Sequence, residues 1–463
     1  MTRNVALICL DTVRKDFFDE YAPRLREAGV GFEQCRAASS WSVPSHASML
    51  TGDLPHEHGI HTFDRDFSAL DRAETFLGGL PAHRAIGASA NVYASSSFGF
   101  DTLFDEYSDV SPQRRFSEGI DVGRFAHDFE GSGGSRIAAF GREALAHPHP
   151  VKSLLNGAMV KLNDLQKVAP IPKLLDDGAR IVSREATRLI EEGDEPFFLF
   201  ANFMDAHPPL QHTLGYDRDL HSAPNGWTTA DVDDETVRDD GKMRRRYCDL
   251  YAAAMDYLDR RLNDLIDEIR AITERDTTVI VTADHGQNLG HPADEGLVGH
   301  VKTSLTEGVL HVPLRVVNPP EGYAPVANYV THLDLPELVV GMANGEHPAV
   351  SRDWVPAEVI GIGDADPDRG RENPRWDRTI RCAYEGETKY VWDTLGARNA
   401  YELDHGRACW QRQVGEDVEL PGWATEFFEG TPGSYRERVR DGGRDDDSID
   451  TATRDRLNDL GYL

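Results

Sequence analysis

Two aspartates in the sequence each follow a short apolar run, a position where a carboxylate can do chemistry. Asp11 follows the run 5–10, and Asp284 follows the run 277–283 and precedes His285. Such runs are typical of buried strands, and the carboxyl ends of parallel strands form the binding crevice of an open α/β sheet. Two carboxylates that meet there can share a hard divalent cation, with an imidazole as a nitrogen ligand. Each aspartate alone also fits a helix cap or a turn.

A second group of reactive side chains lies in the segment 40–52, SWSVPSHASMLTG. Ser42, Ser45 and His46 surround Pro44, directly ahead of a helical stretch. The positive potential at a helix N-terminus favours an alkoxide or a bound anion, so the segment offers a candidate nucleophile. A capping role for Ser45 is the alternative, and the two roles are compatible.

Strand and helix patterns alternate along the chain and must position these residues. Further apolar runs at 197–204 and 312–317 predict strands, and apolar residues at three- and four-residue spacing predict a helix over 247–269. Residues 178–192 predict another helix. The alternation predicts an α/β fold with a large mixed, mainly parallel sheet flanked by helices.

The remaining segments suggest how the chain is divided. Residues 112–176, with breakers near 130, 147 and 169, are expected to be irregular, as a lid or a surface excursion, and 206–240 as a second loop. Near residue 350 the pattern changes to short strand-like pieces. We therefore expect a catalytic domain at 1–350 and a C-terminal α+β subdomain at 351–463, with a small antiparallel sheet and, after an acidic connector, a terminal helix.

The charge balance excludes some classes of partner. The chain carries 79 acidic and 49 basic residues, a net charge of −30, and only eight lysines. A field of this sign repels polyanions, which argues against nucleic acid or an anionic membrane as partner. An acidic, lysine-poor composition is expected of a halophilic protein, because concentrated salt screens its self-repulsion.

The cysteines and the N-terminal segment indicate in which cellular compartment the protein resides. The five cysteines are scattered, without a CxxC pair, which suggests buried thiols in a reducing environment. The chain opens on a predicted strand, and no apolar run is long enough to span a bilayer. These features predict a cytoplasmic protein without membrane insertion. They leave the oligomeric state open.

The nucleophile segment also carries a family resemblance. The string S-x-P-S-H-A-S-x-L-T-G at 42–52 resembles the signature of the sulfatase family, in the alkaline-phosphatase-like superfamily. There, Cys or Ser, any residue, Pro, Ser and Arg precede a run ending in Leu-Thr-Gly. Four more segments are similar to family motifs in the same order: NVALICLDTVR, NFMDAHPP, ADHG and VGHVKTSLTEGVLHVPL. The resemblance, with the acidic composition, indicates a haloarchaeal-type member with serine at the nucleophile position.

The resemblance implies a role for each matching residue. Asp11, Asp284 and His285 would hold one divalent cation, most simply Ca²⁺ and otherwise Mg²⁺ or Mn²⁺, with Ser42 completing the shell and attacking the substrate. The cation would polarise a sulfuryl or phosphoryl oxygen. Two residues, His207 and Lys302, would neutralise the transferring group and protonate the leaving alcohol. Other positions expected in the site are the substrate-binding residues Asn91 and His300.

Two positions depart from the family pattern. The family commonly has paired acids after the first strand, whereas Asp11 is followed by Thr12, so a hydroxyl would replace one metal ligand. His46 stands where the family has the arginine that belongs to the signal for oxidation of Cys or Ser to formylglycine. Hydrated formylglycine can expel sulfate by eliminating back to the aldehyde, an exit that plain serine lacks. A phosphoserine can instead be hydrolysed at phosphorus.

Three hypotheses follow for the function. The first is a sulfuric ester hydrolase that acts at Ser42, as formylglycine or as serine, on a small anionic ester or a sulfated or phosphorylated glycan. The second is a phosphoester hydrolase or phospho-group transferase that uses unmodified Ser42. The third is a catalytically silent binding protein, suggested only by Thr12 and His46.

Overall fold

A seven-stranded sheet forms the centre of the molecule. This computed structural model describes residues 2–111, 114–129, 134–168, 171–300, 303–324, 328–361, 375–440, 453–454 and 456–457. The strand order in the sheet is β2-β10-β7-β1-β6-β4-β5. Its strands are β1 (Asn4–Leu10), β2 (Val30–Phe32), β4 (Arg84–Ser89), β5 (Glu106–Asp109), β6 (Phe197–Phe203), β7 (Thr277–Ala283) and β10 (Leu314–Val317).

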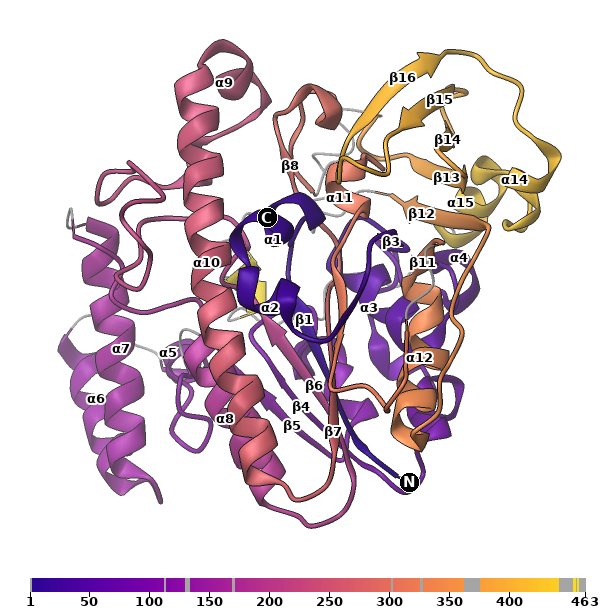
Figure 1. Cartoon of the computed structure of the whole chain (residues 1–463). Coiled ribbons are helices and arrows are strands. Elements are labelled where there is room, and N and C mark those ends of the chain that lie inside the picture. The colour runs from indigo at the N-terminus through magenta and orange to yellow at the C-terminus, as the bar shows by residue number, and fades with distance from the viewer. Residues whose placement is uncertain are drawn as a thin grey trace.

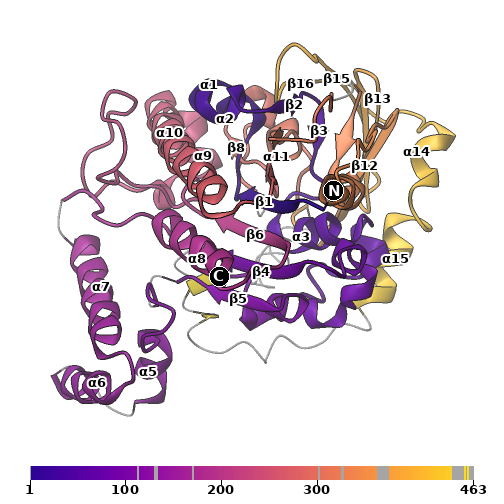
Figure 2. The same ribbon diagram turned by 60° about the horizontal axis from the view of Figure 1, so that its bottom comes forward.

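The direction of the strands confirms a mixed, mainly parallel sheet. Strand β1 lies between β6 and β7 and is parallel to both, and β4 is parallel to β6 and β5. Strand β10 is antiparallel to both β7 and β2. Every residue of β1, β6 and β7 is buried, because helices cover both faces of the sheet (Figures 1 and 2).

The helices that position the site lie on opposite faces of this sheet. On one face lie α8 (Ala179–Glu191) and α10 (Gly241–Ile272), and on the other lie α3 (Ser42–Thr51) and α12 (Leu335–Asn344) (Figure 2). The apolar residues of α10 recur at three- and four-residue spacing and are buried, as the sequence predicts. The shorter helices are α1 (Lys15–Tyr21), α2 (Pro23–Glu27), α4 (Pro55–His58), α9 (Asp234–Asp239) and α11 (Glu307–Leu310).

A separate antiparallel sheet forms the C-terminal part of the chain, as predicted. Its strands pair in sequence order: β12 (Trp354–Ile360), β13 (Thr379–Glu385), β14 (Thr388–Asp393), β15 (Arg398–Leu403) and β16 (Gln411–Gly415). They are followed by α14 (Gly422–Glu426) and α15 (Pro432–Arg440). The boundary between domains at residue 350 stays a prediction. The predicted terminal helix falls mostly outside the described residues.

The segment 112–176 is largely helical, so the expectation of irregular structure was wrong. It contains α5 (Val122–Asp128), α6 (Gly134–Ala146) and α7 (Pro150–Val168). The proline-rich string near 147 separates α6 from α7, and the strings near 130 and 169 flank the pair. These breakers therefore mark helix ends instead of interrupting helices. Helices α6 and α7 stand away from the sheet as a hairpin (Figure 2).

Candidate active site

The carboxyl edge of the central sheet brings the two strand-terminal aspartates together. Leu10 and Ala283 are paired in the register of β1 and β7, so Asp11 and Asp284 leave neighbouring strands at the same level. Gly286, the next residue, packs directly against the backbone of Gly308: a Cβ at position 286 would lie 2.1 Å from the Gly308 carbonyl oxygen. The absence of a side chain at Gly286 therefore lets Asp284 and His285 lie at the edge of the sheet.

Asp11, Asp284 and His285 form a compact and fully buried group of potential ligands. Each offers one ligand atom, and these atoms lie within 4.8 Å of one another. Asp11 Oδ1 and Asp284 Oδ2 are buried, and neither has a hydrogen-bond partner among the described residues. Buried carboxylate oxygens without partners are costly unless a cation balances them. The oxygen and imidazole donors of this cluster fit a divalent cation.

The pKa values of the two carboxylates are shifted in opposite directions. Burial, together with the nearby charge of Asp284, raises the pKa of Asp11 well above its usual value. Burial also pushes the pKa of Asp284 upward, but His285 and His46 outweigh it, so that this pKa is lowered. Without a cation, ionisation of both carboxylates is energetically unfavourable, because the two negative charges are buried and close together. A cation would allow both carboxylates to ionise.

Thr12 lies beside the aspartates in an unusual backbone conformation. Its φ of 61° falls in the left-handed region, where a β-branched residue is strained. The backbone N–H donates to Asp284 Oδ1 at 3.2 Å, and the hydroxyl donates to the Ala206 carbonyl oxygen at 3.1 Å. The hydroxyl oxygen keeps lone pairs for a cation. Its role as a ligand stays a prediction.

Ser42 opens helix α3 and faces the same cluster. Its Oγ lies 3.4 Å from Asp11 Oδ2 and 3.5 Å from His285 Nε2. Asn91, in the loop after β4, donates its Nδ2 hydrogens to Ser42 Oγ at 3.0 Å and to Asp11 Oδ2 at 2.5 Å. The structure thus gathers the predicted nucleophile, one predicted substrate-binding residue and the metal candidates in one site.

Ser45 does not cap the helix, so that alternative was wrong. The residue before α3 is Trp41, which makes no side-chain cap, and Ser45 lies within the first turn of the helix. Its Oγ donates to the Ser39 carbonyl oxygen at 3.2 Å. Ser42 is therefore the hydroxyl of this segment that points to the cluster.

His46 lies behind the cluster, in a buried and mainly apolar setting. Its Nε2 is 3.8 Å from Asp284 Oδ2 and 3.6 Å from Cys9 Sγ, and its ring packs against Phe100 and Phe200. Burial lowers the pKa of His46 to about 4, so the imidazole is neutral near pH 7. This position allows contact with a metal ligand instead of a solvent-facing acid–base role.

His207 and His300 form an imidazole wall beside His285. The ring centroids of His207 and His300 are 5.1 Å apart, and those of His285 and His300 are 4.5 Å apart. Burial, reinforced by His285, lowers the pKa of His207 to about 4 and that of His300 well below its usual value. Lys302, the predicted cationic residue of this segment, lies outside the described residues.

Two neighbours of the site were not predicted. Gln287 Oε1 lies 2.7 Å from His300 Nδ1 and so orients that ring. Asn202 Nδ2 lies 3.4 Å from His46 Nε2, near the end of β6. Gln287 follows the Asp284–His285 pair directly in the sequence, which is a signal for it. The position of Asn202 within an apolar run gives a weaker one.

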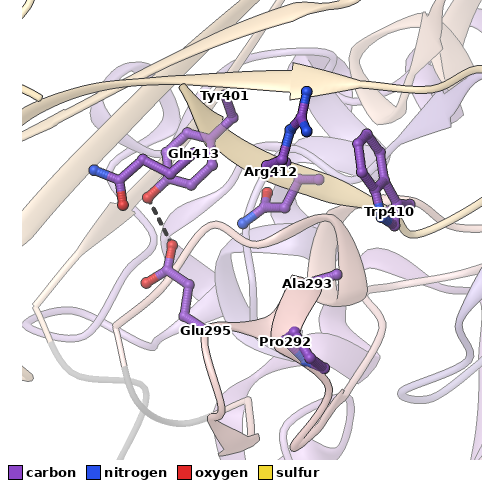
Figure 3. Close-up of a pocket in the computed structure, with 8 residues that line it drawn as sticks. Pro292, Ala293, Glu295, Tyr401, Trp410, Arg412 and Gln413 are labelled. Atoms are coloured by element: carbon purple, nitrogen blue, oxygen red, sulfur yellow. Dashed lines mark hydrogen bonds between the residues drawn. The ribbon is translucent and has the colours of Figure 1, made fainter. Parts of the chain in front are cut away.

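A cavity on the C-terminal sheet lies apart from these residues. It has a volume of about 480 Å³ and lies between the 292–295 turn and strands β15 and β16 (Figure 3). Tyr401 donates a hydrogen bond of 2.7 Å to Glu295 across it, and Trp410 lines another side. None of the candidate site residues lines this cavity.

Comparisons with known proteins identify the family and the fold of the chain. The family model described as Sulfatase matches residues 3–345. Among solved structures, the phosphonate monoester hydrolase of Agrobacterium radiobacter has a TM-score of 0.57 and 15% identity, over 86% of this chain and 89% of that one. The corresponding enzyme of Silicibacter pomeroyi has a TM-score of 0.57 and 16% identity, over 87% and 89%.

A third solved structure is BT4656 in complex with its substrate, D-glucosamine-2-N,6-O-disulfate. Its TM-score is 0.55 and its identity 14%, over 87% of this chain and 91% of that one. At these identities the structural likeness shows the fold alone. No curated protein matches the chain in sequence.

Proposed function

The chain belongs to the sulfatase family, and we propose that it is a metal-dependent hydrolase of sulfate esters that uses residue 42 as its nucleophile. The observation that carries this proposal is the position of Ser42 Oγ. It lies within 3.5 Å of Asp11 Oδ2, His285 Nε2 and Asn91 Nδ2, at the first residue of a helix. Carboxylate, imidazole and amide groups around one hydroxyl form the setting of an activated nucleophile.

The residues of the chain divide the work of ester cleavage among them. Asp11, Asp284 and His285, with Thr12 and residue 42, would hold one divalent cation, Ca²⁺ or otherwise Mg²⁺ or Mn²⁺, which supplies Lewis-acid polarisation. Asn91 fixes the direction of Ser42 Oγ by donating to it. This oxygen attacks sulfur and forms the new ester bond while the bond to the leaving alcohol breaks.

His207, His300 and Lys302 would lie beside the transferring group and the leaving alcohol, where charge changes during the attack. His207 and His300 line one side of the site as neutral rings at pH 7. Each Nδ1 donates to an oxygen of the chain, the Pro208 carbonyl and Gln287 Oε1 respectively, so each Nε2 is left as a proton acceptor. Lys302 would add a positive charge and protonate the leaving alcohol, while His207, neutral at this pH, would contact the transferring group without protonating it. His46 would act from behind, by holding Asp284 in place.

The state of residue 42 decides how the intermediate is released. As hydrated formylglycine it expels sulfate by elimination, whereas a sulfated serine has no comparable exit. The second candidate is therefore a phosphoester hydrolase or phospho-group transferase with unmodified Ser42. His46 in place of the arginine of the modification signal favours it, and the likeness to two phosphonate monoester hydrolases is consistent with it.

The substrate class follows from the chemistry of the site. A cation, the Asn91 amide and Lys302 suit a small anionic ester or a sulfated or phosphorylated glycan. The likeness to a structure that holds a disulfated glucosamine supports the glycan class. The acidic composition and the free cysteines, four of them buried, support a halophilic protein of a reducing cytoplasm.

A panel of esters, assayed with and without metal, tests the proposal. The purified protein would be stripped with a chelator, reloaded with Ca²⁺, Mg²⁺ or Mn²⁺, and given matched aryl sulfate, phosphate and phosphonate monoesters. We expect cation-dependent release of sulfate as the fastest reaction. Faster cleavage of the phosphorus esters would favour the second candidate. Cation binding with no turnover of any ester would identify a binding protein.

A further inference from the structure

The α6–α7 hairpin exposes large apolar side chains to solvent. Ile137 is 60% exposed, and Leu145 and Val151, on either side of the turn, are each 68% exposed. Leu154 and Leu155 on the next turn of α7 are 41% and 38% exposed. Among the described residues of α6, only Ala144 is buried. The hairpin thus projects from the body (Figure 2), and the described residues leave these apolar side chains largely uncovered.

The hairpin also reverses the charge of the chain. Residues 134–168 carry five basic side chains against two acidic ones, in a chain whose net charge is −30. Three of the eight lysines of the whole sequence lie on α7. The basic residues are Arg136, Arg142, Lys152, Lys161 and Lys167, and the acidic ones are Glu143 and Asp164. Lys152 is paired with Glu118 outside the hairpin, whereas Arg136 and Arg142 are exposed on α6, the helix that also exposes Ile137 and Leu145. Positive charge and exposed apolar surface therefore coincide on this helix.

We propose that the α6–α7 hairpin docks the protein peripherally on an anionic lipid surface. Amphipathic helices with basic and apolar side chains lie in the interface plane, where lipid phosphates pair with the bases and acyl chains cover the apolar groups. Leu145 and Val151 enter the acyl boundary beside the turn, and Arg136 and Arg142 contact the head groups. None of the described helices is long and apolar enough to cross a bilayer, so the contact is interfacial.

The charge of the whole chain does not prevent this contact. Repulsion between exposed charges is largely screened beyond about 10 Å at 0.1 M salt, and over shorter distances in stronger salt. The hairpin stands away from the acidic body, so its own positive charge acts at the membrane (Figure 2). Under this proposal, the repulsion expected from the net charge applies to the body of the chain and not to the hairpin.

A second copy of the chain fits this face less well. Two hairpins that pack face to face would bring two sets of basic side chains together. A hairpin placed on the acidic body of another copy would need an apolar patch there. In the part of the chain that the structure describes, four exposed large apolar side chains stand on different elements, namely Ile272, Trp354, Leu395 and Val414. Three more, Ile171, Leu174 and Leu214, lie together where Lys173 pairs with Thr213, next to the hairpin in the chain.

Co-sedimentation with lipid vesicles tests the proposal on the full chain. The vesicles would contain either phosphatidylglycerol with phosphatidylcholine or phosphatidylcholine alone. We expect binding to the anionic vesicles, and a partition coefficient at least about tenfold lower for the variant L145E/V151E. The charge variant R136E/R142E should lose the preference for anionic lipid. The matched control L395E/V414E places the same charges on exposed apolar positions of the C-terminal sheet and should bind as the unaltered protein does.

Circular dichroism and light scattering make the outcomes distinct. Unchanged helix content and melting temperature would show that the variants fold. The proposal is overturned if the unaltered protein ignores anionic vesicles or if L145E/V151E binds them equally well. It is also overturned if the hairpin variant converts a dimer to a monomer without any lipid binding, because the face would then belong to a second copy. None of these readouts depends on ester hydrolysis.

Discussion

Ser42 Oγ lies 3.4 Å from Asp11 Oδ2, although the two residues belong to different elements that are distant in the sequence. Asp11 follows the central strand of the sheet, and Ser42 begins a helix on one of its faces. Asn91 joins them by donating to both oxygens. This contact places the Ser42 hydroxyl beside the two buried carboxylates that would hold the cation.

Replacement of Ser42 by alanine should abolish ester cleavage while the protein stays folded. The variant loses the attacking oxygen, so kcat should fall by roughly a thousandfold or more. Steady-state kinetics on the best ester of the panel would measure the loss. S45A is the matched control, because Ser45 lies on the same buried turn and its hydroxyl donates to the Ser39 carbonyl oxygen and not to the cluster. Comparable losses in both variants would argue against a nucleophilic role for Ser42.

Replacement of Asp284 by asparagine should remove cation binding. The substitution keeps the shape of the side chain but removes one of the two buried negative charges, so cation affinity should fall by about a hundredfold or more. Isothermal titration with Ca²⁺ and Mn²⁺ would measure it, with metal-dependent turnover as a second readout. D267N, on the exposed side of α10, is the control. Unchanged affinity and activity in D284N would refute the metal assignment.

Substitutions at Thr12 test whether its hydroxyl is a cation ligand or only stabilises the local structure. If its oxygen completes the cation shell, T12A should weaken cation binding by about tenfold, and T12S, which keeps the hydroxyl, should restore it. Titration of both variants with the same cation would measure the difference. Equal affinities in T12A and the unaltered protein would assign the hydroxyl only to its bond with the Ala206 carbonyl.

Acid stability should depend on a buried ion cluster that joins the C-terminal sheet to the core. Glu307 Oε2 lies 2.9 Å from Arg36 Nε, and Glu307 Oε1 lies 2.9 Å from Lys389 Nζ. Burial opposes ionisation of Glu307, but the two cations outweigh it and lower its pKa to about 2 from the usual 4.5. A lowered pKa stabilises the fold above pH 4.5, and this contribution is lost as the pH falls from 4.5 toward 2.

The variant E307Q tests this contribution. At pH 7 it should be less stable than the unaltered protein by about 3 kcal/mol, and the difference should shrink as the pH falls toward 2. Urea unfolding across this pH range would measure it. E402Q is the control, because Glu402 is 45% exposed and pairs with Arg412 on the surface. A constant difference at every pH would show that the loss comes from packing and not from ionisation.

The sequence predicted the parts of the site that lie in register on neighbouring strands. Asp11 and Asp284 each end an apolar run, and parallel strands that end together must present such residues at one edge. The meeting of Asn91 with Ser42 could be expected only from the family resemblance, because no periodicity relates a loop after β4 to the start of a helix. The left-handed backbone of Thr12 gives no sequence signal, since its causes are long-range bonds.

The fold shows the same division between local and long-range information. The mainly parallel sheet follows from alternating strands and helices, but the antiparallel direction of β10 does not, because an apolar run has no direction. Helices α6 and α7 were missed because their flanking glycines and prolines dominated the pattern of the whole segment.

The mass of the peptide that contains residue 42 shows which chemical form of the nucleophile is present. The protein would be made in its native host and first shown to hydrolyse a sulfate ester. We expect a peptide lighter by two hydrogens, which identifies formylglycine at this position. An unmodified serine in protein that turns over sulfate esters would contradict the proposed route of release. A phosphate trapped on unmodified Ser42 would instead establish the phosphoester alternative.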